Sequence, residues 1–381
     1  MIYKKLRNRT EKKTGLKRCI SLGLVFVLVL SVLTACASED VVYLNDAYDL
    51  YSDGKYVDAE TAFLKALRNG ETSIAVFSGY AFNQLKAGDI EGAEALLGIM
   101  VNQDNTYGNY FDREPETGEA VRRALLQIYL ARNDYEPAVA LLRQLGDKAT
   151  DKAKEAQYKT SAALLAWQMN REYGDEMFLK DNGRKDLPYY STDELLKIVS
   201  EAIDAGNETI KLYRMRANLY WIKEEWDLWE ADERKIIELK DYAMDEYRAI
   251  YGMRLTESSP KEVLALIDEI VKYLNGHVAY IDNYGEILPM ILKAAEYSDR
   301  VEWEHDGKYY FDLAEQYISA AQDKNVSDNE VLRYQIIIAE KKGKMELAYK
   351  LLGVYLEHVP DDRMAYKEQK YLENRIGVST E

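Results

Sequence analysis

The chain has little of what most catalytic and metal sites require. Its 381 residues include only two cysteines, Cys19 and Cys36, and three histidines, His277, His305 and His358. The histidines lie far apart in sequence, and none stands in an H-x-x-x-H or H-E-x-x-H pattern of a metal site. No Gly-rich phosphate loop and no G-x-S-x-G elbow occurs. We therefore expect no catalytic residue, no metal and no cofactor, and we expect that the protein is not an enzyme.

Residues that interrupt helices are also scarce. Only 6 prolines and 21 glycines occur, and long runs of Ala, Leu, Glu, Lys and Tyr separate them. Apolar residues make up 47% of the chain, which excludes a disordered protein, and they do not alternate with polar ones as they do in strands. This composition predicts an all-α fold.

Positive charge is concentrated at the start of the chain. Eight lysines and arginines in the first 18 residues precede an apolar run from Ile20 to Val32, which ends in Leu33-Thr34-Ala35-Cys36. A basic head followed by an apolar run is typical of a signal that sends the rest of the chain outward. Leu-Thr-Ala-Cys resembles the lipobox of bacterial lipoproteins.

That resemblance implies a signal peptide over residues 1–35 and a lipidated Cys36, carrying a fatty acid such as palmitate, as the mature first residue. Residues 36–42 would be the tether, and the protein would be lipid-anchored on the extracytoplasmic face of a bacterial cell membrane, cytoplasmic or outer. Two alternatives stay open: an ordinary secretory signal, and an uncleaved anchor from Cys19 to Ala35, which is short for a spanning helix. All three predict export.

Removal of the signal changes the charge and the cysteine content. Without residues 1–35 the chain has 42 basic and 65 acidic residues, a net charge of about −23. Such acidity argues against nucleic acid and anionic lipid as partners, because both require clustered Lys and Arg. Cys19 is removed with the signal, so the mature chain has no disulfide to form.

A repeat of 34 residues begins soon after the tether. The segment 47–67 predicts a helix, a glycine turn and a second helix. Its marked positions are Gly54, Tyr56, Ala59, Phe63 and Ala66, and the next copy has Gly88, Ile90, Ala93, Leu97 and Met100. The pattern resembles the tetratricopeptide repeat (TPR). In it a glycine can take positive φ between antiparallel helices, and a small alanine lets the two helices approach closely.

Further copies are weaker. Asn133 and Ala138 repeat the turn and the alanine, and Gly343 to Pro360 contains a good copy with Ala348, Leu352 and Tyr355. Ala217–Leu239 has the length of a repeat, but Trp226 and Trp229 replace its small residue, so we expect a degenerate copy.

The remaining periodic segments predict paired helices. They are Lys154–Arg171, Asp193–Ala205, Tyr242–Gly252, Lys261–Leu274, Ile281–Tyr297 and Tyr309–Gln322. We expect N-terminal TPR-like repeats over residues 43–146, degenerate helical repeats over 147–308, and a C-terminal TPR-like repeat with a terminal helix over 309–376. Stacked helical hairpins of this kind predict a right-handed superhelical solenoid with a concave face.

The TPR resemblance also implies which side chains line that face. First-helix positions are Leu44, Tyr48, Tyr51, Ser78, Phe82, Leu85, Arg123, Gln127 and Leu130. Of these, the predicted partner-binding groove is formed by Tyr48, Tyr51, Phe82, Arg123 and Gln127, since Tyr, Phe and Arg are common binding anchors. The alternative is that several of them pack between helices. Binding of a peptide's terminal carboxylate is not expected, because Leu44, Tyr48, Gly79, Ala120 and Ala124 stand where the family's carboxylate clamp has Lys and Asn.

Two acidic groups are weak candidates for sites. Glu302, Glu304 and Asp306 alternate around Trp303, but sequence spacing cannot establish the carboxylate separation that a glycosidase needs. Asp104, Thr106 and Asp112 suggest a calcium loop, but Tyr107 and Gly108 do not follow its ligand spacing. We expect solvated loops at both places.

The leading hypothesis is a noncatalytic, membrane-tethered scaffold that binds a protein or peptide on its concave face. Its acidity predicts preference for a basic partner, with weaker association at higher salt. The alternative is a carbohydrate-binding lipoprotein that stacks its tyrosines, 31 in number, and its tryptophans on sugar rings.

Overall fold

The computed structural model describes residues 42–71, 73–102, 111, 113–173, 190–277, 281, 284–324 and 329–377. Within these ranges the regular elements are seventeen α-helices, and no strand occurs in them. The chain divides into two compact units, residues 1–223 and 224–381, which are described separately. The boundary between them falls inside the predicted segment 147–308.

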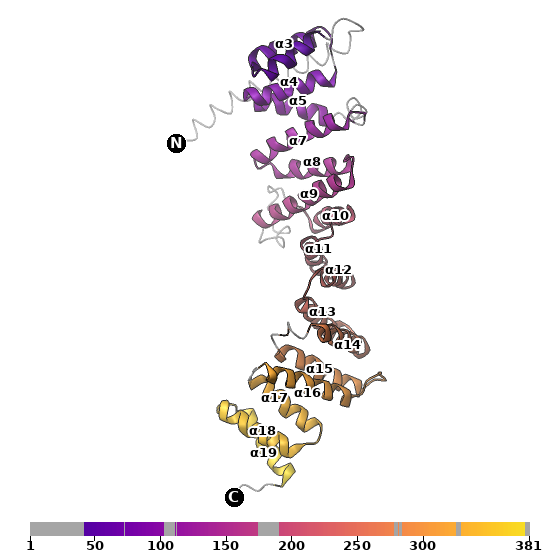
Figure 1. The fold of residues 1–381 in the computed structure, drawn as a ribbon, viewed down its shortest axis with the longest axis vertical. Coiled ribbons are helices and arrows are strands. Elements are labelled where there is room, and N and C mark those ends of the chain that lie inside the picture. The colour runs from indigo at the N-terminus through magenta and orange to yellow at the C-terminus, as the bar shows by residue number, and fades with distance from the viewer. Residues whose placement is uncertain are drawn as a thin grey trace. The chain divides into compact units, whose positions relative to one another are not determined.

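In the first unit each helix packs against the next (Figure 1). Its described helices are α2 (Val42–Ser52), α3 (Tyr56–Arg68), α4 (Ile74–Ala87), α5 (Ile90–Asn102), α7 (Pro115–Ala131), α8 (Tyr135–Asp147), α9 (Lys152–Tyr173), α10 (Thr192–Asp204) and α11 (Ile210–Ile222). Contacts also join α2 to α4, the first helices of successive hairpins.

The second unit has the same neighbour-on-neighbour packing. Its described helices are α12 (Trp226–Leu239), α13 (Met244–Glu257), α14 (Pro260–Gly276), α15 (Tyr284–Ser298), α16 (Gly307–Asp323), α17 (Asn329–Lys341), α18 (Met345–His358) and α19 (Arg363–Ile376). The first helices of two hairpins, α15 and α17, again touch. Both units are therefore built of stacked helical hairpins, which confirms the predicted all-α helical-repeat fold.

One turn geometry recurs wherever the sequence predicted a repeat. The residue at the turn has positive φ in every copy: Gly54 (75°), Gly88 (86°), Asn133 (58°), Glu224 (57°) and Gly343 (73°). In four copies the next amide also donates to a carbonyl five residues earlier, as from Lys55 to Leu50 and from Lys344 to Ala339. These bonds satisfy carbonyl groups at the end of the first helix and reverse the chain.

The residue five positions after each turn lies where the second helix meets its neighbours. Ala59, Ala93, Ala138 and Ala348 are all fully buried at this position, as predicted. In the degenerate copy, the same position is occupied by Trp229, which is only 4% exposed. The large ring is therefore buried, although it stands where the other copies have a methyl group.

A polar network accompanies that substitution. The Glu230 carboxylate accepts from Arg234 Nε at 2.9 Å and from Arg254 Nε at 2.8 Å. Arg234 donates in turn to Glu269 at 2.8 Å. These charge-assisted bonds join α12, α13 and α14, and they satisfy a Glu230 side chain that is only 7% exposed.

The predicted helix positions are confirmed, and most of their ends differ from the structure by one to three residues. The largest difference is at α13, which runs from Met244 to Glu257, five residues beyond the predicted end at Gly252. Gly252 lies inside this helix and does not end it, because a glycine within a helix costs only about 1 kcal/mol relative to alanine.

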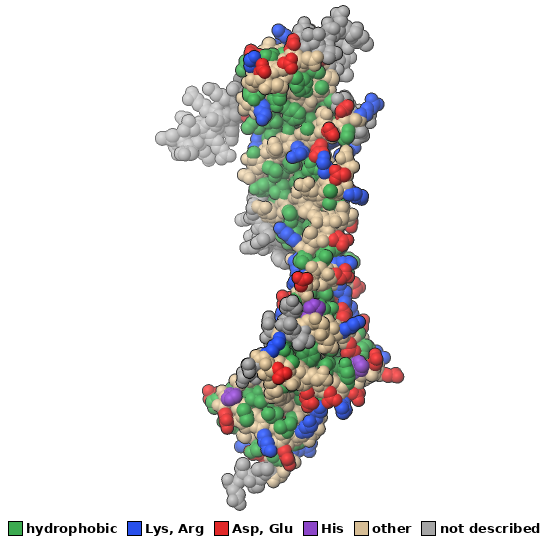
Figure 2. Space-filling view, in the orientation of Figure 1, with side chains coloured by type: hydrophobic (Ala, Val, Ile, Leu, Met, Phe, Trp, Pro, Cys, Tyr) green, Lys and Arg blue, Asp and Glu red, His purple; other side chains and the backbone are tan. Residues whose placement is uncertain are grey.

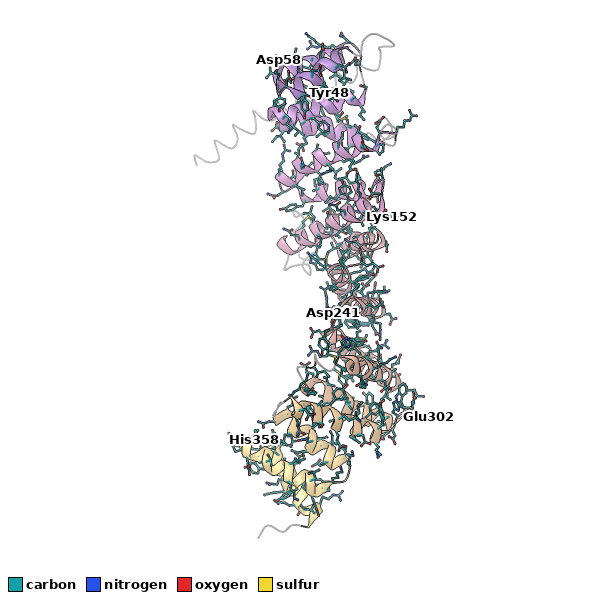
Figure 3. The ribbon with its side chains drawn as sticks, in the orientation of Figure 1. Tyr48, Asp58, Lys152, Asp241, Glu302 and His358 are labelled. Carbon is teal, nitrogen blue, oxygen red and sulfur yellow. The ribbon has the colours of Figure 1, made fainter. Side chains whose placement is uncertain are left out.

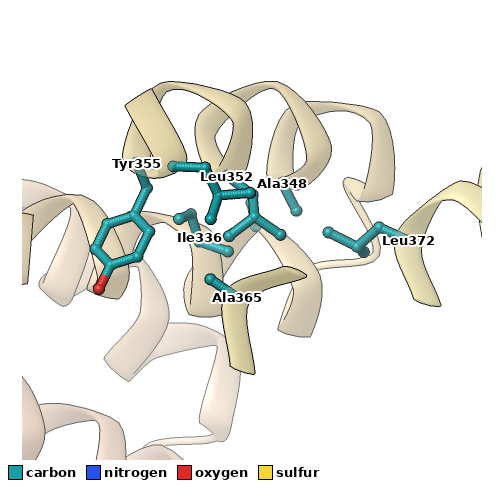
Figure 4. Close-up of a cluster of buried hydrophobic side chains, with 8 residues drawn as sticks. Ile336, Ala348, Leu352, Tyr355, Ala365 and Leu372 are labelled. Carbon is teal, nitrogen blue, oxygen red and sulfur yellow. The ribbon is translucent and has the colours of Figure 1, made fainter. Parts of the chain in front are cut away.

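The C-terminal copy has its own core. Buried side chains from α17, α18 and α19 pack together here, among them Ile336, Ala348, Leu352, Ala365 and Leu372 (Figure 4). The Tyr355 ring lies at one side of the cluster, and its hydroxyl donates to Asp362 Oδ2 at 3.0 Å. Asp362 also caps α19 by accepting from the Met364 and Ala365 amides, so this residue both starts the last helix and ties it to α18.

Candidate partner-binding groove

A groove of about 390 Å³ lies between α7, α8 and α9 of the first unit. From α7 it is lined by Arg123, Leu126, Gln127 and Leu130, from α8 by Leu142, and from α9 by Gln157, Tyr158, Ser161 and Leu165. On the face of this unit shown in Figure 2, hydrophobic side chains gather over the middle of the helices.

The groove has a buried floor and accessible walls. Leu126 and Leu142 are almost fully buried, whereas Leu130 is 40% exposed. Arg123, Gln127 and Leu130 are spaced four and three residues apart, so they share one face of α7. All three are among the predicted first-helix positions, and the structure brings them together at one site.

Local packing sets the separation of α8 and α9. A Cβ atom on Gly146 would lie 2.7 Å from Lys159 Cγ, so the glycine allows the lysine stem of α9 to cross α8 closely. Lys159 Nζ then contacts Asp147 at 3.2 Å and Glu155 at 2.9 Å. The Asp151 side chain accepts from the Lys154 amide at 2.8 Å and caps the start of α9.

Charges at one end of the groove are unequally paired. Glu119 accepts from Lys154 Nζ at 2.7 Å and from the Tyr158 hydroxyl at 2.6 Å. These two bonds hold the pKa of Glu119 below its usual value. Arg123, whose side chain is 60% exposed, approaches Glu119 only to 3.9 Å. The positive charge of Arg123 is therefore less compensated than that of Lys154.

Tyr158 supports this arrangement. Burial, and then its bond to Glu119, raise the pKa of Tyr158 to about 12. The phenol therefore keeps its proton at neutral pH and goes on donating it to Glu119. Arg123 is the one charged side chain among the residues that line the groove.

The other predicted groove residues lie elsewhere. Tyr48, labelled in Figure 3, lies among α2, α3 and α4, where its hydroxyl donates to Ala75 O and its ring meets Phe63 edge-on at 5.4 Å. Tyr51 is half-buried beside Tyr56, with ring centroids 5.9 Å apart. Phe82 is half-buried on α4. None of Tyr48, Tyr51 and Phe82 lines the α7–α9 groove.

Several lining residues were not predicted. The groove is completed by Leu126, Leu142, Gln157, Tyr158, Ser161 and Leu165. Leu142 stands four residues after Ala138, as Phe63 stands after Ala59, so its inward position was present in the repeat pattern. The α9 residues follow no marked repeat position, and only the packing of α9 against α8 shows that they belong here.

The acidic stretch around Trp303 has structural roles. The Trp303 indole donates to Asp268 Oδ2 at 3.0 Å, and Asp306 accepts from the Tyr309 amide at 2.9 Å as the cap of α16. Glu302, labelled in Figure 3, and Glu304 are exposed. The residues of the suggested calcium loop, Asp104, Thr106 and Asp112, lie outside the described ranges.

The histidines contact neighbouring side chains or backbone. His277 stacks on Tyr273 at 4.3 Å, His305 stacks on Tyr309 at 3.9 Å, and His358 Nδ1 lies 3.0 Å from Asn329 Oδ1. The described part of the chain holds no group of three His, Cys, Asp or Glu that could bind a metal.

Among the residues that the structure covers, no helix is both long and apolar enough to cross a membrane. The apolar run Ile20–Val32 and Cys36 lie outside these residues.

No family model matches the chain, and no curated protein matches it. Among solved structures, the chain is similar to a tetratricopeptide repeat protein from Parabacteroides merdae (12% identity, TM-score 0.27), covering 78% of this chain and 97% of that one. A thermophilic TPR protein of Thermus thermophilus is 18% identical (TM-score 0.19), with 74% of this chain and 97% of that one covered.

The C-terminal part of a TPR repeat-containing protein from Cytophaga hutchinsonii is 13% identical, with a TM-score of 0.25, and covers 85% of this chain and 98% of that one. The fold itself is established by the helices and turns of this chain.

Proposed function

We propose that the protein is a noncatalytic helical-repeat scaffold that binds a protein or peptide segment in the α7–α9 groove. The observation that carries this proposal is the groove itself, which has a leucine floor, polar walls and one weakly compensated arginine. Apolar grooves with a few placed polar groups are the usual form of a binding site, and helical repeats offer such surfaces without chemistry of their own.

We further propose that a lipid on Cys36 tethers this scaffold to the outer face of a bacterial membrane, cytoplasmic or outer. The support is the basic head, the apolar run and the Leu-Thr-Ala-Cys sequence. Radiolabelled palmitate should enter the wild-type protein and should not enter a Cys36→Ser variant. Equal labelling of the two would show that the lipid is not on Cys36, and no labelling of either would remove the anchor from the proposal.

Binding in the groove is tested by site-specific photocrosslinking in the native cells. A photoreactive residue at Gln127 should capture a protein partner, whereas one at Thr61, an exposed residue of α3, should not. A Ser161→Trp substitution places a bulky ring in the groove and should abolish capture from Gln127. Capture that persists with Ser161→Trp would show that the partner does not occupy the groove.

The acidity of the mature chain supports a partner of net positive charge. Long-range attraction between opposite net charges accelerates association and weakens as salt rises. An association rate that does not change between low and high salt would remove this part of the proposal.

Two of the described aromatic groups argue against glycan capture. The Trp303 indole donates to Asp268, and Tyr273 stacks on His277 with the Tyr242 ring close to both, so these rings contact protein groups rather than standing free. Calorimetry with soluble glycans would detect sugar binding directly.

A further inference from the structure

We propose that the α7–α9 groove selects a segment that has a leucine- or methionine-sized side chain with an aspartate or glutamate one to three residues away. The apolar side chain would lie on the leucine floor, and the carboxylate would pair with Arg123. This inference rests on the proposed function and specifies the chemistry of the bound segment.

The apolar part follows from the floor and walls. Leu126 of α7 and Leu142 of α8 form a buried floor. Leu130 of α7 and Leu165 of α9 border this floor. A polar side chain placed here would lose its water without gaining a partner from these leucines. An unbranched or γ-branched apolar side chain could lie on this floor and displace water from the leucine surfaces.

The acidic part follows from the charge balance. Glu119 already has two short bonds, to Lys154 and Tyr158, and Arg123 is left with a contact of 3.9 Å. A guanidinium offers a fork of donors that a carboxylate can accept in pairs. An incoming carboxylate therefore meets an exposed cation, whereas an incoming lysine meets a like charge.

The spacing follows from helix geometry. Arg123 precedes Leu126 by three residues and Leu130 by seven, which corresponds to about 5 Å and about 10 Å along α7. An extended segment advances about 3.3 Å per residue, so one to three residues span the distance from the leucine floor to Arg123. Gln127, Gln157 and Ser161 border this path and carry donors and acceptors for the main chain of the segment.

The experiment uses the purified full chain in mild detergent and a set of fluorescein-labelled peptides of about twelve residues with both ends capped, which removes terminal charges. A central Leu or Met is combined with Asp at each offset from −3 to +3. Matched sets carry Lys instead of Asp, or Ser instead of the apolar residue. We expect at least one Leu/Asp peptide to bind about tenfold or more tightly than its Lys and Ser counterparts.

Variants then locate the interaction. Arg123→Glu should reverse the preference from the Asp to the Lys peptide. Arg68→Glu, which makes the same charge change at an exposed position of α3, should leave the preference unchanged. Ser161→Trp should abolish binding of every peptide.

The outcomes separate the two proposals. If Asp and Lys peptides bind equally, or Arg123→Glu leaves the preference as it was, the inference about partner chemistry is wrong, while loss of binding in Ser161→Trp would still support the groove. Binding that survives Ser161→Trp would overturn both. If no peptide binds at concentrations up to about 1 mM, the inference is also overturned.

Discussion

The Tyr48 hydroxyl donates a hydrogen bond of 2.7 Å to the carbonyl oxygen of Ala75, so Tyr48 ties α2 to α4. Gly79 makes room for this ring, because a Cβ atom there would lie 2.7 Å from the Tyr48 hydroxyl oxygen. In the repeat pattern Tyr48 corresponds to Gln127, which lines the α7–α9 groove. The same repeat position therefore serves packing in one copy and an accessible surface in another.

Loss of this hydroxyl should affect stability and not binding. In Tyr48→Phe we expect the free energy of unfolding of α2–α4 to fall by about 1 kcal/mol, because the hydrogen bond from the Tyr48 hydroxyl to Ala75 O is lost. Hydrogen exchange of these helices measures the change. Tyr51→Phe, which removes a nearby hydroxyl, should change stability by less than about 0.5 kcal/mol. Loss of peptide binding in Tyr48→Phe would show that Tyr48 takes part in binding and would contradict a purely structural role.

Gly79 should not tolerate a methyl group. In Gly79→Ala the added Cβ would lie 2.7 Å from Phe63 Cε1 and from the Tyr48 hydroxyl oxygen. We expect destabilisation of about 1–3 kcal/mol from overpacking, which outweighs the better helix propensity of alanine. The matched control is Gly98→Ala in α5, where nothing lies within 4 Å, and there we expect stabilisation of about 0.5–1 kcal/mol. Urea unfolding compares the two variants, and equal effects would contradict the packing argument.

Glu224 has φ of 57°, a conformation that costs a residue with a side chain about 1–2 kcal/mol. Glu224→Gly should therefore stabilise the second unit by about 0.5–1 kcal/mol, after the larger chain entropy of glycine is subtracted. Gly343→Ala tests the reverse change at the corresponding turn, where φ is 73° and nothing lies within 4 Å. It should destabilise this unit by about 1 kcal/mol. Thermal unfolding and hydrogen exchange of α12–α19 measure both effects.

Asp312 should make the second unit sensitive to acid. Its carboxylate lies 2.6 Å from both Lys308 Nζ and Lys342 Nζ, and these bonds lower its pKa to about 2. Because the folded-state pKa is below the unfolded value of about 3.9, the contribution is complete above about pH 4 and is lost as the pH falls toward 2. Asp312→Asn should remove this part of the pH dependence.

NMR titration of the Asp312 carboxyl group gives the direct measurement. Lys308→Gln should raise its midpoint, and Lys350→Gln, a change at an exposed lysine of α18, should leave it unchanged. A wild-type midpoint near 4 would contradict the assigned ion pairs.

Much of the fold could be predicted because its signals are local. The turn requires a residue that can take positive φ, such as glycine or asparagine, and the helix contact five residues later requires a small side chain such as alanine. Both residues can be recognised in the sequence without knowledge of the rest of the chain. The degenerate copy is the informative exception. Trp229 does not fit the alanine pattern, yet Glu224 takes the same turn conformation, and the network of Arg234, Glu230 and Arg254 links the adjoining helices.

The candidate site could be predicted only in part. Arg123 and Gln127 were predicted because the tetratricopeptide resemblance implies that these first-helix positions line the concave face. Their counterparts on α9, including Ser161 and Leu165, have no repeat signature. Only the packing of α8 and α9 shows that these side chains line the same groove.

The amino-acid sequence by itself determined the helical class, the turns and the acidic character of this protein, because each depends on composition or on residues a few positions apart. Tertiary structure decided which equivalent positions face a partner. Whether an aromatic ring or a glutamine stays accessible depends on the space that neighbouring helices leave for it. Gly79 of α4, for example, leaves room for the Tyr48 ring of α2. Such space exists only once the helices have packed.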